Sequence, residues 1–226
     1  GLLSDGELAA LLKTLQSFGG QVSWRALEGG EQHPYEVNIA LFDALQGTVR
    51  GVDTMGFARF VCAHAIMFAL EGIPGVYIHS LLGTRNDYQR MENTGHNRAI
   101  NRHQWQWAQL ESELGNAASP HRQVMLALEA LLRLRGEQPA FHPNAAQFTL
   151  HLGTALFGFS RQSREPEQQI FCVSNITDEP RPLNLLDLNL VEEADWEDLI
   201  SGQPYPDLDR LLQLEPYQTV WISRRG

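Results

Sequence analysis

Hydrophobic positions in the first part of the chain recur mostly at helical spacing. After Asp5, which can cap a helix, ELAALLKTLQSF repeats leucines three and four positions apart and stops at Gly19. The run FARFVCAHAIMFAL, residues 57–70, is apolar nearly all round, which is typical of a helix buried on most sides. Pro120 opens a third segment with a wide leucine face, which ends at Gly136. The pattern predicts three helices.

Between these helices the pattern predicts one buried strand and two long loops. The strand is GVYIHSLL, residues 75–82, a short continuous apolar run with β-branched and aromatic members. Residues 20–38 and residues 83–118 are polar and rich in glycine, and we expect both to be long loops.

Beyond Pro143 the pattern changes to short runs, several of them alternating, such as FTLHL, QIFCVSN and YQTVWIS. Proline, glycine, asparagine and aspartate separate these runs, which indicates an all-β domain. We predict an α+β chain with two domains, residues 1–143 and residues 144–226. The first domain has one strand, so if it belongs to a closed (β/α)8 barrel, most of that barrel lies outside this chain.

Composition narrows the class of function. The chain has 226 residues, 43% of them hydrophobic, and a formal net charge of -10 at neutral pH. So acidic a chain is a poor binder of nucleic acid or anionic membranes. It has two cysteines, no Cys/His ligand spacing and no secretory signal. We therefore expect a cytoplasmic protein without a metal site.

One polar segment concentrates candidate chemistry. TGHNRAINRH, residues 94–103, places two arginines and two histidines among glycine and asparagines, in a stretch too broken for a helix interior. Together with GIPGVYIHSLLGTRNDYQRMEN before it and PYEVNIALFDAL, residues 34–45, it resembles the sucrose-phosphorylase-like branch of the α-amylase superfamily, glycoside hydrolase family thirteen. The resemblance covers nearly the whole chain.

The resemblance implies the C-terminal part of a (β/α)8 barrel followed by a β-sandwich. It also implies retaining transfer of an α-glucosyl group to phosphate, with an α-glucoside and phosphate as small-molecule partners and no cofactor. Such transfer needs two carboxylates about 5 Å apart. In the family these acids lie on strands that would precede residue 1, so we expect no catalytic residue here and no activity from this chain alone.

The resemblance also implies a substrate-binding set. Arg98 matches the family arginine that binds glucose hydroxyls, and Tyr35 and Glu36 match positions that face acceptor or phosphate. His33 stands where sucrose phosphorylases carry an aspartate, which favours relatives with phosphorylated or acidic acceptors.

Other interpretations of these residues stay open. Arg98 and Arg102 could pair with Asp87 and Glu92 in a solvated loop, and these two acids could be offered as a catalytic pair, although neither has an adjacent base. Trp105 could stack on a sugar, but tryptophans more often fill interfaces.

Other functions stay open too. The whole enzyme could be a hydrolase, or the β-domain could be a non-catalytic carbohydrate-binding or stabilising module. The apolar flank of residues 57–82 predicts self-association or a missing partner segment.

Overall fold

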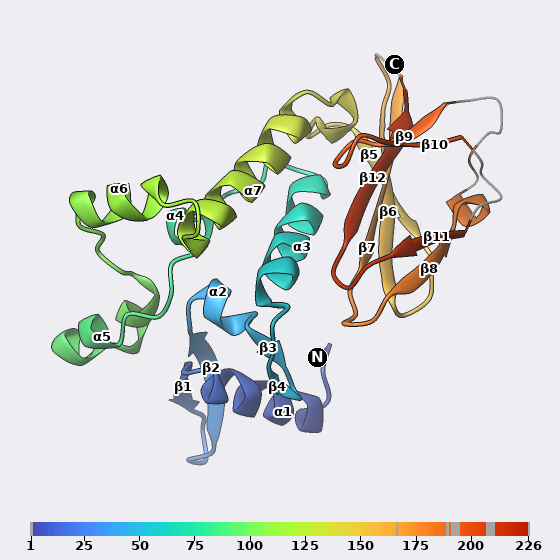
Figure 1. Ribbon diagram of the computed structural model, residues 1–226. Helices are drawn as coiled ribbons and strands as arrows, with labels where there is room; N and C mark the ends of the chain where they lie inside the picture. Colours follow the sequence, from blue (N-terminus) through green and yellow to red (C-terminus); the bar gives the residue numbers. More distant parts are fainter. Residues whose placement is uncertain (1, 166, 189, 191–194, 207–210, 226) are drawn as a thin grey trace. The chain divides into compact units, whose positions relative to one another are not determined.

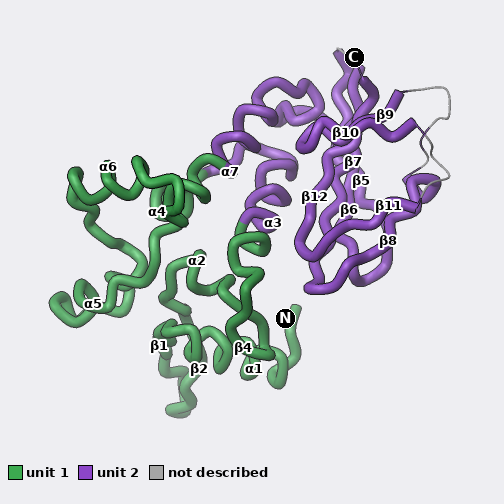
Figure 2. The backbone as a smooth tube through the Cα atoms, in the orientation of Figure 1, with its two compact units in different colours: residues 1–60, 76–126 green, residues 61–75, 127–226 purple. Residues whose placement is uncertain are grey.

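The computed structural model describes every residue except 1, 166, 189, 191–194, 207–210 and 226 (Figure 1). The chain forms two compact units that do not follow chain order (Figure 2). Unit 1 is Gly1–Phe60 with Val76–Leu126, and unit 2 is Val61–Gly75 with Ala127–Gly226. The domain boundary between residues 143 and 144 stays a prediction.

Unit 1 is mainly helical, with short antiparallel strand pairs. Its elements are α1 (Asp5–Ser17), β1 (Gln21–Ala26), β2 (Gln32–Asn38), α2 (Leu41–Ala44), β3 (Gly47–Thr48), β4 (Gly51–Val52), α4 (Ile78–Leu81), α5 (Tyr88–Thr94), the 3-10 helix η1 (Asn97–Asn101) and α6 (Trp107–Gly115). Helices α3 (Gly56–Ala69) and α7 (Pro120–Gly136) contribute residues to both units. The three helices predicted from their apolar patterns are confirmed.

The N-cap of the first helix lies one residue earlier than predicted. Ser4, not Asp5, is the N-cap, because its hydroxyl accepts from the Glu7 N–H while the Glu7 carboxylate accepts from the Ser4 N–H at 2.8 Å. Gly19 has φ +88°, a conformation that ends a helix with little strain only in glycine.

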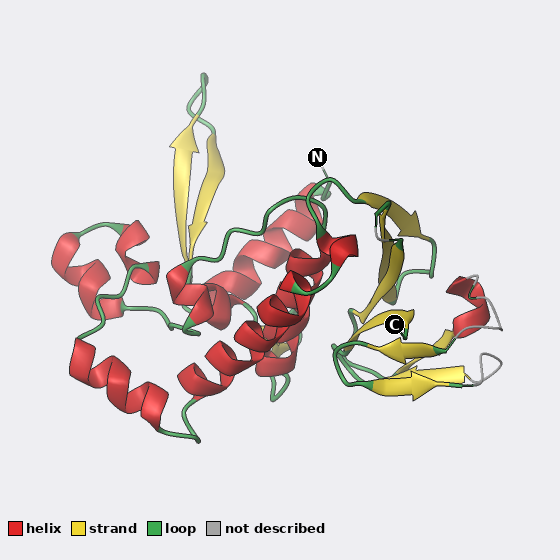
Figure 3. Ribbon diagram, turned by 90° about the horizontal axis from the view of Figure 1, so that it is seen from above, coloured by secondary structure: helices red, strands yellow, loops and turns green. Residues whose placement is uncertain are grey.

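The loop predicted over residues 20–38 is instead a β-hairpin of β1 and β2 (Figure 3). Gly29 and Gly30 adopt positive φ in its turn. Most of its side chains are exposed or half-buried on both faces. The sequence therefore lacks the alternation of apolar and polar residues that would predict these strands.

The buried strand predicted over residues 75–82 is wrong. Residues 75–77 pair with no strand among the described residues, and α4 follows at once. Tyr77 and Ile78 are both about half exposed. An apolar run becomes a strand only when neighbouring strands take up its backbone N–H and C=O groups, and the described part of the chain offers none here.

Helices α5, η1 and α6 occupy the polar stretch predicted as a loop over residues 83–118. Asp87 caps α5, and Gly95, with φ +67°, ends it. The core of unit 1 includes an edge-to-face pair between Phe42 and Phe60, and Ile100 of η1 is fully buried.

Unit 2 is built on a six-stranded antiparallel sheet with the order β10-β9-β12-β7-β6-β5, and β8 and β11 form a second sheet. The elements are η2 (Pro139–Phe141), β5 (Ala146–Leu150), β6 (Leu156–Ser163), β7 (Gln168–Asn175), β8 (Arg181–Asn184), η3 (Leu185–Leu188), β9 (Trp196–Asp198), β10 (Gln203–Tyr205), β11 (Leu211–Leu214) and β12 (Thr219–Arg224). Side chains from both sheets form one core, so the sheets pack face to face as a sandwich. The α+β class and the all-β region are confirmed.

Two buried cysteines belong to unit 2. Cys62 lies on α3, where Thr219 donates to its sulfur, and Cys172 lies on β7. Burial raises the pKa of both thiols. In the part of the chain that the structure describes, no helix combines the length and apolar character needed to cross a membrane.

Candidate functional site

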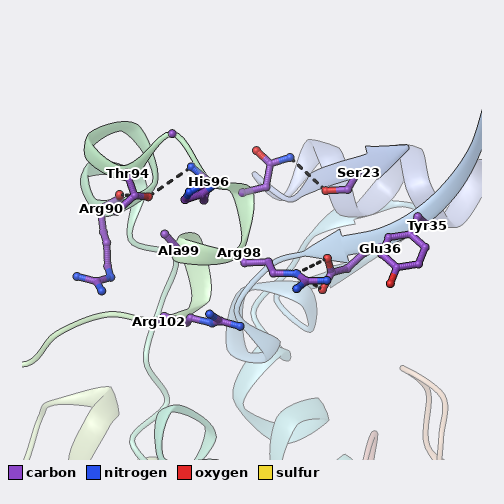
Figure 4. A pocket seen from close by; sticks show the side chains of 11 residues that line it. Ser23, Tyr35, Glu36, Arg90, Thr94, His96, Arg98, Ala99 and Arg102 are labelled. Atoms are coloured by element: carbon purple, nitrogen blue, oxygen red, sulfur yellow. Dashed lines mark hydrogen bonds and ion pairs between the residues drawn. The ribbon is translucent and has the colours of Figure 1, made fainter. Parts of the chain in front are cut away.

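A pocket of about 690 Å³ lies in unit 1, between the hairpin and the segment that follows α5 (Figure 4). That volume is in the range of small-molecule sites. Its lining residues are Ser23, Tyr35, Glu36, Arg90, Thr94, Gly95, His96, Asn97, Arg98, Ala99 and Arg102. Two lips can be distinguished, the hairpin lip (Ser23, Tyr35 and Glu36) and the arginine lip (residues 90–102).

A β-bulge explains how Tyr35 and Glu36 both line the pocket. Neighbouring residues of a regular strand point to opposite faces. In this hairpin Ser23 pairs with Glu36 and Trp24 pairs with Pro34, which leaves Tyr35 without a partner in the ladder. Such an extra residue bends the strand and re-aims a side chain.

Arg98 and Glu36 join the two lips by an ion pair. The Arg98 Nε atom donates to both oxygens of the Glu36 carboxylate, at 3.1 and 2.8 Å (Figure 4). Hydrogen bonding to Glu36, and then its charge, raise the pKa of the Arg98 guanidinium. The Ser23 hydroxyl adds a second link, since it accepts from Asn38 at 3.2 Å and from Asn97 at 3.3 Å.

The pocket is strongly basic, although the chain is acidic. Arg90, Arg98 and Arg102 all line it, and Glu36 is the only carboxylate among its lining residues. The Arg102 side chain has no hydrogen bond or ion pair with any other described residue, so the pairing with Asp87 or Glu92 weighed above is not formed. The Nε atom of Arg90 is buried and finds no partner in the described chain. Guanidinium groups in this arrangement suit a phosphate or a carboxylate.

Three of the four substrate-binding residues predicted from the sequence meet at this pocket, and His33 does not. Tyr35, Glu36 and Arg98 line it, whereas His33 is exposed on β2 and lies 3.8 Å from Glu31 near the turn. The proposed roles of all four residues stay predictions.

Sequence reasoning missed Ser23 and Arg90. Ser23 belonged to a stretch predicted as a loop, and Arg90 lies on a helix that was not predicted. Only a helix prediction over residues 88–94 could have indicated that Arg90 and Arg98 lie near one another.

The described residues contain no group of three or more His, Cys, Asp or Glu side chains arranged to hold a metal ion. Asp87 and Glu92, weighed above as a carboxylate pair, do not line the pocket.

Comparison with known proteins gives several relatives and no matching family model. The chain is 37% identical over 223 residues to the glucosylglycerate phosphorylase of Allomeiothermus silvanus, a match that covers 98% of this chain and 37% of that protein. It is 33% identical over 226 residues to the glucosylglycerate phosphorylase of Escherichia coli, over 99% of this chain and 38% of that protein. The chain therefore spans less than two fifths of the length of these relatives.

Solved structures share the fold. The crystal structure of sucrose 6F-phosphate phosphorylase from Thermoanaerobacter thermosaccharolyticum aligns with a TM-score of 0.61 at 21% identity, covering 79% of this chain and 35% of that one. An α-amylase from Geobacillus thermoleovorans aligns with a TM-score of 0.57 at 17% identity, covering 75% and 34%. Over nearly its whole length the chain is similar to the C-terminal portion of glucosylglycerate phosphorylases, and its fold is that of the corresponding part of glycoside hydrolase family thirteen enzymes.

Proposed function

We propose that this chain supplies the acceptor-facing and phosphate-facing part of an α-glucoside phosphorylase whose acceptor is acidic. The enzyme would transfer glucose from the α-glucoside to inorganic phosphate with retention of configuration, by double displacement. The relatives named glucosylglycerate phosphorylase support an acceptor of this kind, because glycerate carries a carboxylate.

The grouping of three guanidinium groups around Tyr35 and Glu36 is the observation that carries the proposal. Inorganic phosphate and the carboxylate of an acidic acceptor are both oxyanions, and both accept charge-assisted hydrogen bonds from arginine. Phosphate replaces the released acceptor in a phosphorylase, so one basic pocket can serve the two anions in turn.

The catalytic carboxylates are proposed to lie outside this chain. Retaining transfer needs two acids, and the one carboxylate that lines this pocket, Glu36, already accepts hydrogen bonds from Arg98. The chain alone should therefore bind anions without turning over a glucoside.

Titration calorimetry with this chain tests the binding part of the proposal. We expect saturable binding of inorganic phosphate and of D-glycerate, and a loss of roughly tenfold or more in affinity for Arg98→Ala, since the variant removes a charged hydrogen-bond donor from the pocket. Arg98→Ala also leaves the Glu36 carboxylate unpaired, which repels the anion.

Arg133→Ala is the matched control. Arg133 is an exposed arginine on α7 that pairs with Glu129 outside the pocket, so its loss should leave phosphate affinity unchanged. Equal effects of the two variants would contradict the proposal. Glucose 1-phosphate formed by this chain from phosphate and any α-glucoside would show that the chain holds its own catalytic acids.

A carbohydrate-binding β-domain is the second candidate function. Its support is limited to Phe148 and Phe157, the two exposed aromatic side chains among the described residues of β5 to β12. The tryptophans and tyrosines of that region, which would stack best on sugars, are buried: Trp196, Tyr205, Tyr217 and Trp221. Glucan binding abolished by Phe148→Ala would favour this candidate.

Release of glucose in place of glucose 1-phosphate by the full-length enzyme would favour a hydrolase.

A further inference from the structure

The two lips of the pocket come from distant parts of the chain, yet they must be held in register. Glu36 and Arg98 are 62 positions apart. The Arg98 side chain is 54% exposed, and an exposed ion pair contributes too little energy to fix two segments. One hydrogen bond between Asn97 and Ser23 also links the lips, at 3.3 Å. A larger group of contacts, at Asn86 and Asp87, ties the segments that flank both lips.

Asn86 holds the chain just beyond the hairpin lip. Its side-chain oxygen accepts from the Ala40 N–H at 2.7 Å, two residues after β2 ends. Its own N–H donates to the Asp43 carboxylate at 2.6 Å, and the second oxygen of that carboxylate accepts from Arg85. Asp43 is 6% exposed, so these bonds are shielded from water.

Asp87 closes the arginine lip at both ends. One carboxylate oxygen accepts from the Arg90 N–H at 2.8 Å, which caps α5, and the other lies 2.6 Å from His103 Nδ1. The Asp87 N–H donates to the carbonyl of Ile100 at 2.7 Å, and Ile100 is fully buried. The arginine lip thus runs from Arg90 to the residue before His103, and both Arg90 and His103 bond to the Asp87 carboxylate.

The electrostatics of Asp87 agree with this geometry. Burial by itself raises the pKa of this carboxyl, but the Arg90 N–H, the hydrogen bond to His103 and the nearby charges hold the pKa below its ordinary value. Asp87 does not line the pocket, and each of its oxygens already has a partner, so it is no candidate for contact with a substrate.

We propose that the dipeptide Asn86-Asp87, named here the positioning hub, fixes the hairpin lip and the arginine lip relative to one another and so presents the pocket arginines to one anion. Asn86 acts through Ala40 and Asp43, and Asp87 acts through His103 and Ile100. The inference takes its ligand from the proposed function, while the placing of the lips is independent of it.

Asp87→Asn is the first variant. Asparagine caps helices about as well as aspartate, so the variant removes mainly the charge and the link to His103. The matched control is Glu92→Gln, an exposed residue of the same helix with the same change of charge, which does not line the pocket. His103→Gln, which leaves the Asp87 contacts to Arg90 and Ile100 in place, is the second variant if Asp87→Asn fails to fold.

Amide hydrogen exchange followed by phosphate titration gives two separate measurements. We expect exchange over residues 88–102 to accelerate about tenfold or more in Asp87→Asn and not in Glu92→Gln. We also expect phosphate affinity to fall at least about fivefold when it is measured well below the melting temperature of the variant. In an Arg102→Ala background, Asp87→Asn should weaken binding much less, because the hub acts through the arginines.

The outcomes separate the two proposals. Exchange in Asp87→Asn and His103→Gln no faster than in the control would overturn the hub, as would an undiminished effect on affinity in the Arg102→Ala background. If the unmodified chain binds neither phosphate nor glycerate while exchange accelerates as expected, the hub stands and the proposed function fails.

Discussion

At the scale of single residues, the Arg98–Glu36 pair sets how much positive charge the pocket offers. The Glu36 carboxylate occupies the Nε side of the Arg98 guanidinium, where an incoming anion could otherwise bind. A phosphate entering the pocket therefore meets one competing negative charge among three arginines. Removing that charge should strengthen binding and not weaken it.

Glu36→Gln tests this competition. We expect the affinity for inorganic phosphate to rise several-fold, because like charges at close range repel and the guanidinium is released. Titration calorimetry measures the change. Glu31→Gln, on the exposed turn of the same hairpin, is the control and should leave affinity as it is. Weaker binding by Glu36→Gln would mean that Glu36 orients Arg98 more than it competes with the anion.

Single residues also show how far the sequence could predict the site. Tyr35, Glu36 and Arg98 were matched by their motifs, and the structure brings them together. His33 was included because it stands where sucrose phosphorylases carry an aspartate, but it lies away from the pocket, since the bulge at Tyr35 changes which side chains of β2 face it. A bulge depends on pairing with another strand, so a linear motif does not encode it.

At the scale of elements, the end of α3 depends on a buried arginine. Arg161 on β6 is fully buried and donates to the carbonyl of Ala69, the last residue of α3, at 2.8 Å. It also donates to the carbonyls of His142 and Ala145. The bonds to Ala69 and Ala145 are buried and supply a donor to a helix end and a turn, whereas the His142 carbonyl also accepts from the Ala145 N–H.

Arg161→Met should lower the free energy of unfolding by at least about 2 kcal/mol, since the buried carbonyls of Ala69 and Ala145 would lose this charged donor. Urea denaturation followed by circular dichroism measures the loss. The control is Arg133→Met, which removes one exposed pair with Glu129 and should cost about 0.5 kcal/mol or less. If the two variants denature alike, α3 does not depend on this contact.

The predicted elements succeeded where local pattern decides the structure and failed where pairing does. Two of the three helices were predicted from leucine spacing and from glycine and proline near their ends, and the third from a run that is apolar nearly all round. The hairpin β1–β2 was missed because its strands bury neither face, and the strand over residues 75–82 was predicted although it finds no neighbour. Strand formation is a property of at least two segments.

At the scale of the whole molecule, fewer large apolar side chains are exposed than the sequence indicated. The flank of residues 57–82 was predicted to be open, but Phe60 and Phe68 of α3 are fully buried. Large apolar side chains that stay exposed in this range are Phe57, Ile73, Tyr77 and Ile78, of which Ile73 is the most open at 85%.

Self-association stays a prediction, now with a dependence on salt. A formal charge of -10 opposes contact between copies, and salt screens that repulsion. We expect the mean mass measured by light scattering to rise between low and moderate ionic strength. The variant Ile73→Ser should lower the mass at moderate salt, with Ile176→Ser as a control at another exposed isoleucine. A monodisperse monomer at every salt concentration would contradict the prediction.

The placement of Cys62 and Cys172 has a practical consequence for following the molecule in solution. Both are in unit 2, both are buried, and the sequence has no other cysteine. A thiol reagent attacks the exposed thiolate, so it can reach either sulfur only when unit 2 opens. The rate of labelling therefore reports the opening of unit 2 alone. Unit 1, which holds the pocket, can become more or less flexible when an anion binds without changing that rate.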